Sequence, residues 1–170
     1  KVARDIDKDY PGLKELISDM YETMYATHGV GLAAPQVNLS IRLLVMDATP
    51  YSEEDPAAKD FKRVLINPKI IEESGDDWTF NEGCLSIPEI REDVIRKPKI
   101  RIQYYDDSWE FHDETYEGVM GRIIQHEYDH LDGRLFIDLI NPLRRKLLAP
   151  RLNAISKGHG EADYKMIYPK

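Results

Sequence analysis

The residues best suited to chemistry are His126, Glu127 and His130, which fall within a stretch of five residues. On an α-helix, positions i and i+4 project from the same face, so both imidazoles can reach one divalent metal ion. Glu127 would then lie beside the metal, where its carboxylate can accept and deliver a proton. The alternative is that the two histidines merely pack in a core. Two imidazoles do not complete a metal site, so a third ligand is needed.

Cys84 is the only cysteine of the chain and a candidate for the third ligand. A single cysteine cannot form an intramolecular disulfide, and it is often only a small buried hydrophobic residue. A thiolate with two imidazoles nevertheless suits zinc or ferrous iron, and three protein ligands leave a position open for water, as in catalytic sites. Gly83 allows a close approach of the backbone at this point. Other candidate ligands are the many carboxylates and His28, His112 and His159.

Composition limits the class of protein. The chain has 170 residues, of which 42% are hydrophobic and 32% charged, as is typical of a soluble globular protein. Apolar runs are shorter than the roughly 18 residues of a membrane span, and the first residues lack the features of a secretory signal. A net charge of -8 argues against nucleic-acid binding. We therefore expect a cytoplasmic protein without membrane association or specific nucleic-acid binding, with one domain over residues 1–170 and a polar tail over 157–170.

Hydrophobic repeats of three and four residues predict helices in three segments: 13–25, 117–133 and 142–150. Gly29 is expected to end the first helix and Gly133 the second. The second helix carries the two histidines on its apolar, buried face. Pro150 is expected to kink or end the third helix.

Apolar runs of strand length predict strands at 41–46, 63–71, 78–80, 94–95, 100–104 and 109–116. The last two form the clearest predicted hairpin. The segment 29–36, rich in small residues with two glycines and a proline, is expected to be a tight loop. The strands cluster around one helix without regular strand-helix alternation. This pattern favours an α+β fold, with mixed, largely antiparallel short sheets packed around a central metal-binding helix.

Three segments resemble the signature motifs of peptide deformylases: Gly29-Val30-Gly31-Leu32-Ala33-Ala34-Pro35-Gln36, Glu82-Gly83-Cys84-Leu85-Ser86 and Gln125-His126-Glu127-Tyr128-Asp129-His130-Leu131-Asp132-Gly133. They occur in the family's order and span most of the chain. The resemblance implies that Cys84, His126 and His130 bind one divalent metal ion, with ferrous iron as the physiological ion and zinc, nickel or cobalt as replacements. It also implies a hydrolase that removes the formyl group from N-formylmethionyl peptides and releases formate.

The chemistry that this resemblance implies needs a base and an oxyanion site. Metal coordination can lower the pKa of water from 15.7 to about 7, and Glu127 would accept the proton and pass it to the leaving amine. The resemblance implies that the Gln36 side-chain amide and the Leu85 backbone N–H stabilise the oxyanion. The second nitrogen of each ligand imidazole also needs an acceptor, for which Asp129 is a candidate unless it faces solvent.

Five residues are expected to bind the substrate: Val30, Gly31, Arg91, Val119 and Ile123. Gly31 is expected to let its backbone pair with the extended peptide as an added strand. Arg91 is a candidate for holding a substrate carbonyl, and an ion pair with Glu82 or another acid is the alternative. The methionine side chain is expected to contact Val30, Leu85, Val119, Ile123 and His126, although Val119 and Ile123 could equally be core residues.

Two other functions remain open at this point. A zinc metallopeptidase would use the same helix but would commonly take its third ligand from a downstream histidine or glutamate. A non-catalytic, metal-stabilised interaction module would need a fourth protein ligand, and it could dock on the ribosome through Arg144-Arg145-Lys146. That basic segment is more often a solvated helix face. Deformylases usually have a further segment before the position of Lys1, so we expect the N-terminus of this chain to be trimmed.

Overall fold

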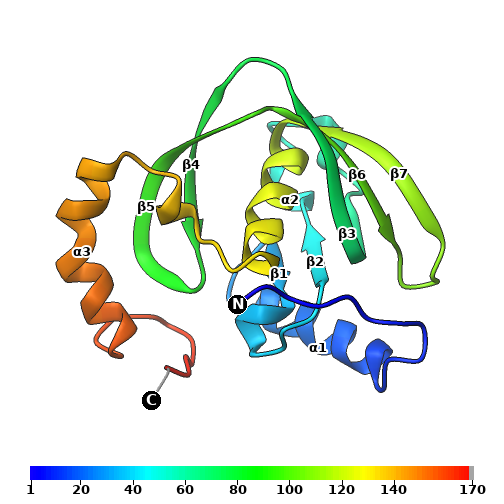
Figure 1. The fold of residues 1–170 in the computed structure, drawn as a ribbon, viewed down its shortest axis with the longest axis horizontal. Helices are drawn as coiled ribbons and strands as arrows, with labels where there is room; N and C mark the ends of the chain where they lie inside the picture. Colours follow the sequence, from blue (N-terminus) through cyan, green and yellow to red (C-terminus); the bar gives the residue numbers. More distant parts are fainter. Residues whose placement is uncertain (169–170) are drawn as a thin grey trace.

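The computed structural model describes residues 1–168 and combines helices with antiparallel sheets (Figure 1). The helices are α1 (Leu13–Ala26), α2 (Gly118–Leu131) and α3 (Pro142–Ser156). The strands are β1 (Gly31–Ala33), β2 (Leu43–Asp47), β3 (Lys62–Ser74), β4 (Trp78–Cys84), β5 (Ile87–Arg96), β6 (Lys99–Tyr105) and β7 (Phe111–Glu117). The predicted α+β class is confirmed. Within the described residues, no helix has the length and apolar character that a membrane span requires.

The strands form two separate sheets around the central helix. The larger sheet has the order β1-β2-β3-β6-β7, and each neighbouring pair is antiparallel. The strands β4 and β5 form a second, two-stranded antiparallel sheet. Figure 1 shows α2 between the β4–β5 hairpin and the larger sheet. The histidine-bearing helix is therefore enclosed on two sides.

The strand β2 explains how the larger sheet holds a helix on each face. Its residues Leu43, Leu44, Val45 and Met46 are all 0% exposed, so the strand is apolar throughout rather than alternating. Successive side chains of a strand point to opposite faces. Leu44 and Met46 accordingly pack in the core cluster that includes α2, whereas Leu43 and Val45 pack in the cluster that includes α1. Burial on both faces fixes α2 relative to the sheet.

The first helix ends one turn earlier than Gly29. The amide N–H groups of His28 and Gly29 donate to the carbonyls of Tyr25 and Met24, and His28 takes the left-handed conformation at φ 56. This pairing is the Schellman motif, in which glycine usually holds the left-handed position. The prediction that Gly29 ends the helix was therefore wrong. A Cβ at Gly29 would lie 2.9 Å from Leu85 Cδ1, so the glycine makes room for a side chain of the second motif.

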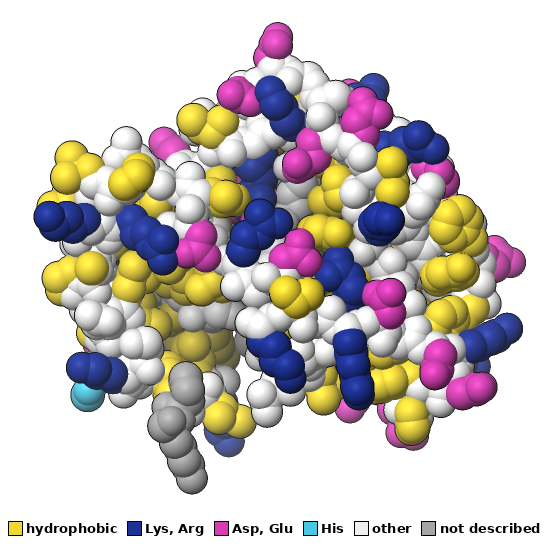
Figure 2. All heavy atoms as spheres, in the orientation of Figure 1, with side chains coloured by type: hydrophobic (Ala, Val, Ile, Leu, Met, Phe, Trp, Pro, Cys, Tyr) yellow, Lys and Arg dark blue, Asp and Glu magenta, His cyan; other side chains and the backbone are white. Residues whose placement is uncertain are grey.

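The third helix continues past Pro150 to Ser156, so the proline does not end it. The helix begins as expected, because the Asn141 side chain accepts a hydrogen bond from the Leu143 N–H and Pro142 follows the cap. Beyond the proline, Ile155 is buried in a cluster with residues of β5. This packing compensates for the one backbone donor that Pro150 lacks. Figure 2 shows hydrophobic and basic side chains together on the surface of α3.

Two motif segments are ordered elements rather than loops. The segment 29–36 contains β1 and most of a 3-10 helix, Ala34–Val37. The predicted strands 78–80 and 94–95 extend toward each other into β4 and β5, so Cys84 lies at the end of a strand. Glycine and proline weakened the strand signal in both segments. Strand structure gives these residues a defined position next to α2.

Candidate active site

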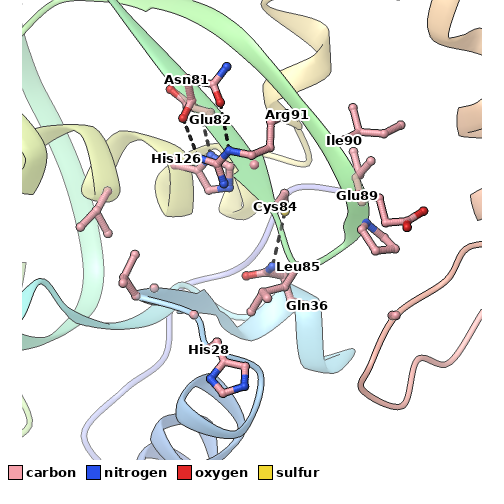
Figure 3. A pocket seen from close by; sticks show the side chains of 18 of the residues that line it. His28, Gln36, Asn81, Glu82, Cys84, Leu85, Glu89, Ile90, Arg91 and His126 are labelled. Atoms are coloured by element: carbon pink, nitrogen blue, oxygen red, sulfur yellow. Dashed lines mark hydrogen bonds and ion pairs between the residues drawn. The ribbon is translucent and has the colours of Figure 1, made fainter. Parts of the chain in front are cut away.

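The three predicted metal ligands converge. Cys84 at the end of β4 faces His126 and His130 on α2, and the ligand atoms of the three side chains all lie within 4.8 Å of one another. The Cys84 Sγ lies 3.3 Å from His130 Nε2. Figure 3 shows Cys84 and His126 projecting from their two elements toward the same pocket. One sulfur and two nitrogen donors at this spacing fit a divalent metal such as zinc or ferrous iron.

The electrostatics of this cluster favour an ionised cysteine. Burial opposes ionisation of the thiol, but hydrogen bonds with His126 and His130 lower the pKa of Cys84 to about 5. Burial likewise disfavours a charged imidazole, but the bonds with Cys84 and Glu82 raise the pKa of His126. A metal ion binds thiolate and neutral imidazole, so it would replace protons held within this cluster.

Glu82 orients the first histidine. Its carboxylate accepts a hydrogen bond from His126 Nδ1 at 2.9 Å, which leaves Nε2 of the ring for a metal. Arg96 donates to both oxygens of Glu82 at 2.8 and 3.0 Å, and Arg122 donates a third bond at 3.0 Å. Burial raises the pKa of Glu82, but these bonds outweigh it and lower the pKa to about 2. Glu82 is thus an ionised acceptor for the His126 ring at neutral pH.

Asp129 does not contact the imidazoles and does not face solvent. It is 5% exposed, and it accepts a hydrogen bond from Arg96 Nη1 at 2.7 Å. The prediction that Asp129 orients a ligand histidine is wrong, because Arg96 lies between its carboxylate and Glu82. Asp129 instead holds the arginine that holds Glu82.

Glu127 lies buried beside the ligand cluster. The residue is 5% exposed, and its Oε2 has no hydrogen-bond partner within the described part of the chain. Burial raises the pKa of Glu127, against the opposing effect of the two histidines. A Cβ at Gly31 would lie 2.5 Å from Glu127 Oε1. Gly31 is therefore required by the carboxylate itself, whereas the sequence suggested only the approach of a peptide.

Gln36 is held with its amide nitrogen toward the site. Its Oε1 accepts a hydrogen bond from the Ala33 N–H at 2.8 Å. Its Nε2 lies 3.2 Å from Ser86 Oγ and 3.7 Å from Cys84 Sγ, the contact drawn in Figure 3. Leu85 lies in the turn between β4 and β5, next to Cys84. Both residues expected to supply the oxyanion donors, Gln36 and Leu85, therefore lie close to Cys84 and line the same cavity.

A cavity of about 890 Å³ opens onto these groups. Four of the five residues expected to bind the substrate line it: Val30, Gly31, Arg91 and Ile123. Val119 is not among the lining residues, and it packs against the core between α2 and the larger sheet. The structure thus favours the alternative of a core residue at this position, and contact of Val119 with the substrate stays a prediction. Lining residues that the sequence did not reveal include His28, Tyr51, Phe80, Asn81 and Ile90.

Arg91 is exposed at the mouth of this cavity and is held by Asn81. It donates to the Asn81 side-chain oxygen at 3.0 Å and to the Asn81 carbonyl at 2.7 Å. The alternative that Arg91 forms an ion pair with Glu82 is wrong, because that carboxylate binds Arg96 and Arg122. A Cβ at Gly83 would lie 2.7 Å from Arg91 Nη1, so this glycine provides the close approach that the sequence suggested.

The C-terminal tail also reaches the site, which the sequence did not predict. Residues 160–164 line the cavity, and the Tyr164 hydroxyl donates a hydrogen bond to the Leu85 carbonyl at 2.7 Å. Of the predicted polar tail over 157–170, the last two residues lie outside the described part. The tail lacks hydrophobic periodicity, and its two tyrosines are the only large aromatic residues that could indicate packing against the rest of the protein.

Comparisons with known proteins agree with this geometry. Residues 1–146 match the family model described as polypeptide deformylase. The peptide deformylase of Christiangramia forsetii is 53% identical, over 99% of this chain and 90% of that protein. That of Flavobacterium johnsoniae is 50% identical, over 98% of this chain and 88% of that protein.

Solved structures give the same result at the level of the fold. A crystal structure of peptide deformylase from Plasmodium falciparum superimposes with a TM-score of 0.82 at 36% identity, covering 95% of this chain and 94% of that one. The peptide deformylase of Thermotoga maritima gives a TM-score of 0.74 at 41% identity, covering 84% and 90%. The chain therefore belongs to the peptide deformylase family, whose members remove the formyl group from the N-terminus of newly made polypeptides and release formate.

Proposed function

We propose that Cys84, His126 and His130 hold one divalent metal ion and that Glu127 moves the proton in deformylation. The observation that carries this proposal is the convergence of one sulfur and two imidazoles within 4.8 Å of one another, with Cys84, His126 and the buried carboxylate of Glu127 lining one cavity. When bound, the metal would act as a Lewis acid and lower the pKa of water from 15.7 to about 7. Glu127 would accept the water proton and deliver it to the leaving amine of methionine, a role typically worth about 10² to 10⁴ in rate.

Gln36 and Leu85 are the proposed donors to the oxyanion of the tetrahedral intermediate. The fixed orientation of the Gln36 amide supports this role, because its carbonyl oxygen is already used by Ala33 and its nitrogen is directed at the site. The Leu85 N–H lies in the turn next to Cys84. A preorganised donor of this kind typically contributes about 3 to 4 kcal/mol to lowering the barrier.

The substrate peptide is proposed to pair with β1. This strand is at the edge of the larger sheet, since its only partner strand in the described chain is β2. An extended peptide can add to such an edge. Val30, Leu85 and Ile123 would then contact the methionine side chain, and Arg91, already oriented by Asn81, would hold a carbonyl of the peptide.

Ferrous iron is the proposed physiological metal, and the thiolate and two imidazoles that support it also suit zinc, nickel or cobalt. The cytoplasm is the proposed location, because the substrates are newly made chains and the thiolate of Cys84 requires reducing conditions. Ribosome docking through Arg144-Arg145-Lys146 has less support. Arg144 already pairs with Glu92, and Arg145 lies 2.8 Å from Asp138.

The test is formate release from formyl-Met-Ala-Ser, measured together with bound metal, for Glu127→Gln. The variant should bind about one metal ion per chain yet react about 10² to 10⁴ times more slowly than the parent. The matched control is Glu117→Gln, an exposed glutamate next to the start of the same helix, which should react at the parent rate. A second variant, Cys84→Ser, should lose metal.

Two results would contradict the proposal. Glu127→Gln could release formate at the parent rate, which would remove its assigned role. Alternatively, Cys84→Ser could keep full metal occupancy, which would show that the ligand set is wrong and would favour a metallopeptidase-like arrangement.

A further inference from the structure

The C-terminal tail is an integral part of the active site. After α3 the chain turns back toward the tip of the β4–β5 hairpin (Figure 1). Residues 160–164 line the same cavity as Glu127 and Arg91. The start of this segment is closely packed, because a Cβ at Gly160 would lie 3.1 Å from Ile155 and 3.5 Å from Pro88.

A single peptide group links the tail to the proposed sulfur ligand. The Tyr164 hydroxyl donates to the Leu85 carbonyl oxygen at 2.7 Å. The N–H of the same peptide group belongs to Ser86, and it donates to Cys84 Sγ at 3.4 Å. Hydrogen bonds at the two ends of one peptide group polarise each other. The hydroxyl therefore both orients this peptide plane and strengthens its N–H as a donor to the sulfur.

The other sides of this turn are already fixed by contacts within the folded core. The Leu85 side chain packs against Gly29, where a larger residue would collide with it. Ser86 Oγ accepts a hydrogen bond from Gln36 Nε2. The Leu85 carbonyl accepts its side-chain hydrogen bond from the tail, through Tyr164. Burial raises the pKa of the Tyr164 hydroxyl, so the group remains a donor at neutral pH.

We propose that Tyr164 is a positioning residue for deformylation, which holds the Leu85–Ser86 peptide so that Cys84 and the Leu85 N–H are aligned for the reaction. The residue touches neither metal nor substrate in this role. The inference rests on the proposed functions of Cys84 and Leu85. The tail that carries Tyr164 would also form one wall of the channel for the peptide.

The test compares Tyr164→Phe with Tyr168→Phe in the cobalt-loaded enzyme. The two tyrosines lie in the same tail, but the Tyr168 hydroxyl contacts the sulfur of Met166 rather than the site. Losing a hydrogen bond of ordinary strength corresponds to a change of about fivefold in a rate constant. We expect Tyr164→Phe to lower kcat about fivefold with KM changed less than twofold, whereas Tyr168→Phe should match the parent.

Two spectroscopic readouts separate positioning from a general effect on folding. The sulfur-to-cobalt charge-transfer absorption should shift in Tyr164→Phe, because the donor to Cys84 is weakened. Amide hydrogen exchange at Ser86 should become faster in that variant and stay unchanged in Tyr168→Phe. A chain ending at His159, which leaves α3 intact, should show the same spectral shift and a raised KM, because the channel wall is removed.

Parental kcat and an unshifted cobalt band in Tyr164→Phe or in the shortened chain would overturn the inference. Glu127→Gln is assayed alongside to keep two failures apart. If Glu127→Gln is inactive while Tyr164→Phe equals the parent, only the role of Tyr164 fails. If Glu127→Gln is fully active, the proposed active site itself is wrong.

Discussion

The chain contains two arginine–carboxylate pairs of nearly identical geometry in very different surroundings. Behind the proposed metal ligands, Arg96 donates to Glu82 through Nε and Nη2 at 2.8 and 3.0 Å. On the β6–β7 hairpin, Arg101 donates to Asp113 through the same atoms, both at 2.8 Å. The pKa of each carboxylate is lowered to about 2. The side chains of the first pair are 7% and 3% exposed, and those of the second are 49% and 28% exposed.

This comparison shows that neither bond lengths nor a lowered pKa measures what an ion pair contributes. An exposed pair is screened by water, and ordering its side chains costs entropy. A buried pair pays a large desolvation penalty, so removing one partner leaves a charge without compensation. Breaking the buried pair therefore lowers the stability of the fold strongly, although replacing both partners by apolar side chains could leave the protein equally stable.

A buried network of Glu82, Asp129, Arg96 and Arg122 lies next to His126, which Glu82 contacts. Glu82 and Asp129 carry two negative charges, and Arg96 and Arg122 balance them. Arg122 also lies over the Trp78 ring at 4.7 Å. An apolar core at this place would give His126 no acceptor for Nδ1, and the orientation of a metal ligand depends on that acceptor. We infer that the network is retained for the metal centre.

The largest expected effect on stability is that of Arg96→Met. This change would leave Asp129 buried without its nearest cation and would remove two donors from Glu82. Breaking a buried pair in this way costs about 3 to 5 kcal/mol. Urea unfolding of the metal-free protein measures it. A loss of unfolding free energy no larger than that of a surface variant would show that the buried and the exposed pair contribute equally.

A smaller loss of stability is expected for Asp129→Asn. Asparagine keeps the size of the side chain and one acceptor oxygen, and Arg96 keeps its bonds to Glu82. The change weakens one hydrogen bond between charged groups, which corresponds to about 1.5 to 3 kcal/mol. The same unfolding experiment applies. A loss equal to that of Arg96→Met would mean that Asp129, rather than Glu82, is the main partner of the arginine.

The smallest effect is expected for Asp113→Asn on the hairpin. Its partner Arg101 is free to turn to water, so the unfolding midpoint should equal that of the parent within error. The result should hold in low and moderate salt. A clear loss of stability would show that paired geometry, rather than burial, determines the contribution of these ion pairs.

Some features of the site could be predicted because their causes are local. The helix α2 has a continuous apolar stripe and a terminating glycine, and the spacing of His126 and His130 is a property of any helix. The family resemblance added Cys84, which lies far away in the sequence. These three residues do converge.

Other features depend on tertiary contacts that leave little trace in one sequence. Glu82 was part of a recognised motif, but its bond to His126 requires that β4 lie against α2. The sequence also placed Val119 one turn from Ile123 on the same helix, without showing that the pocket stops short of it. Tyr164 lies in a polar tail, and nothing local predicts that its hydroxyl reaches Leu85.

The role of the buried network at the metal centre is tested by the metal affinity of Glu82→Gln compared with that of Asp113→Asn. Both changes neutralise a carboxylate whose pKa is about 2 and that binds an arginine through two bonds, but only Glu82 contacts His126, a proposed metal ligand. The dissociation constant for zinc, measured by competition with a chelator on folded protein, should rise about 10- to 100-fold for Glu82→Gln and stay at the parent value for Asp113→Asn. Equal affinities in the two variants would contradict the claim that the buried network holds the metal centre.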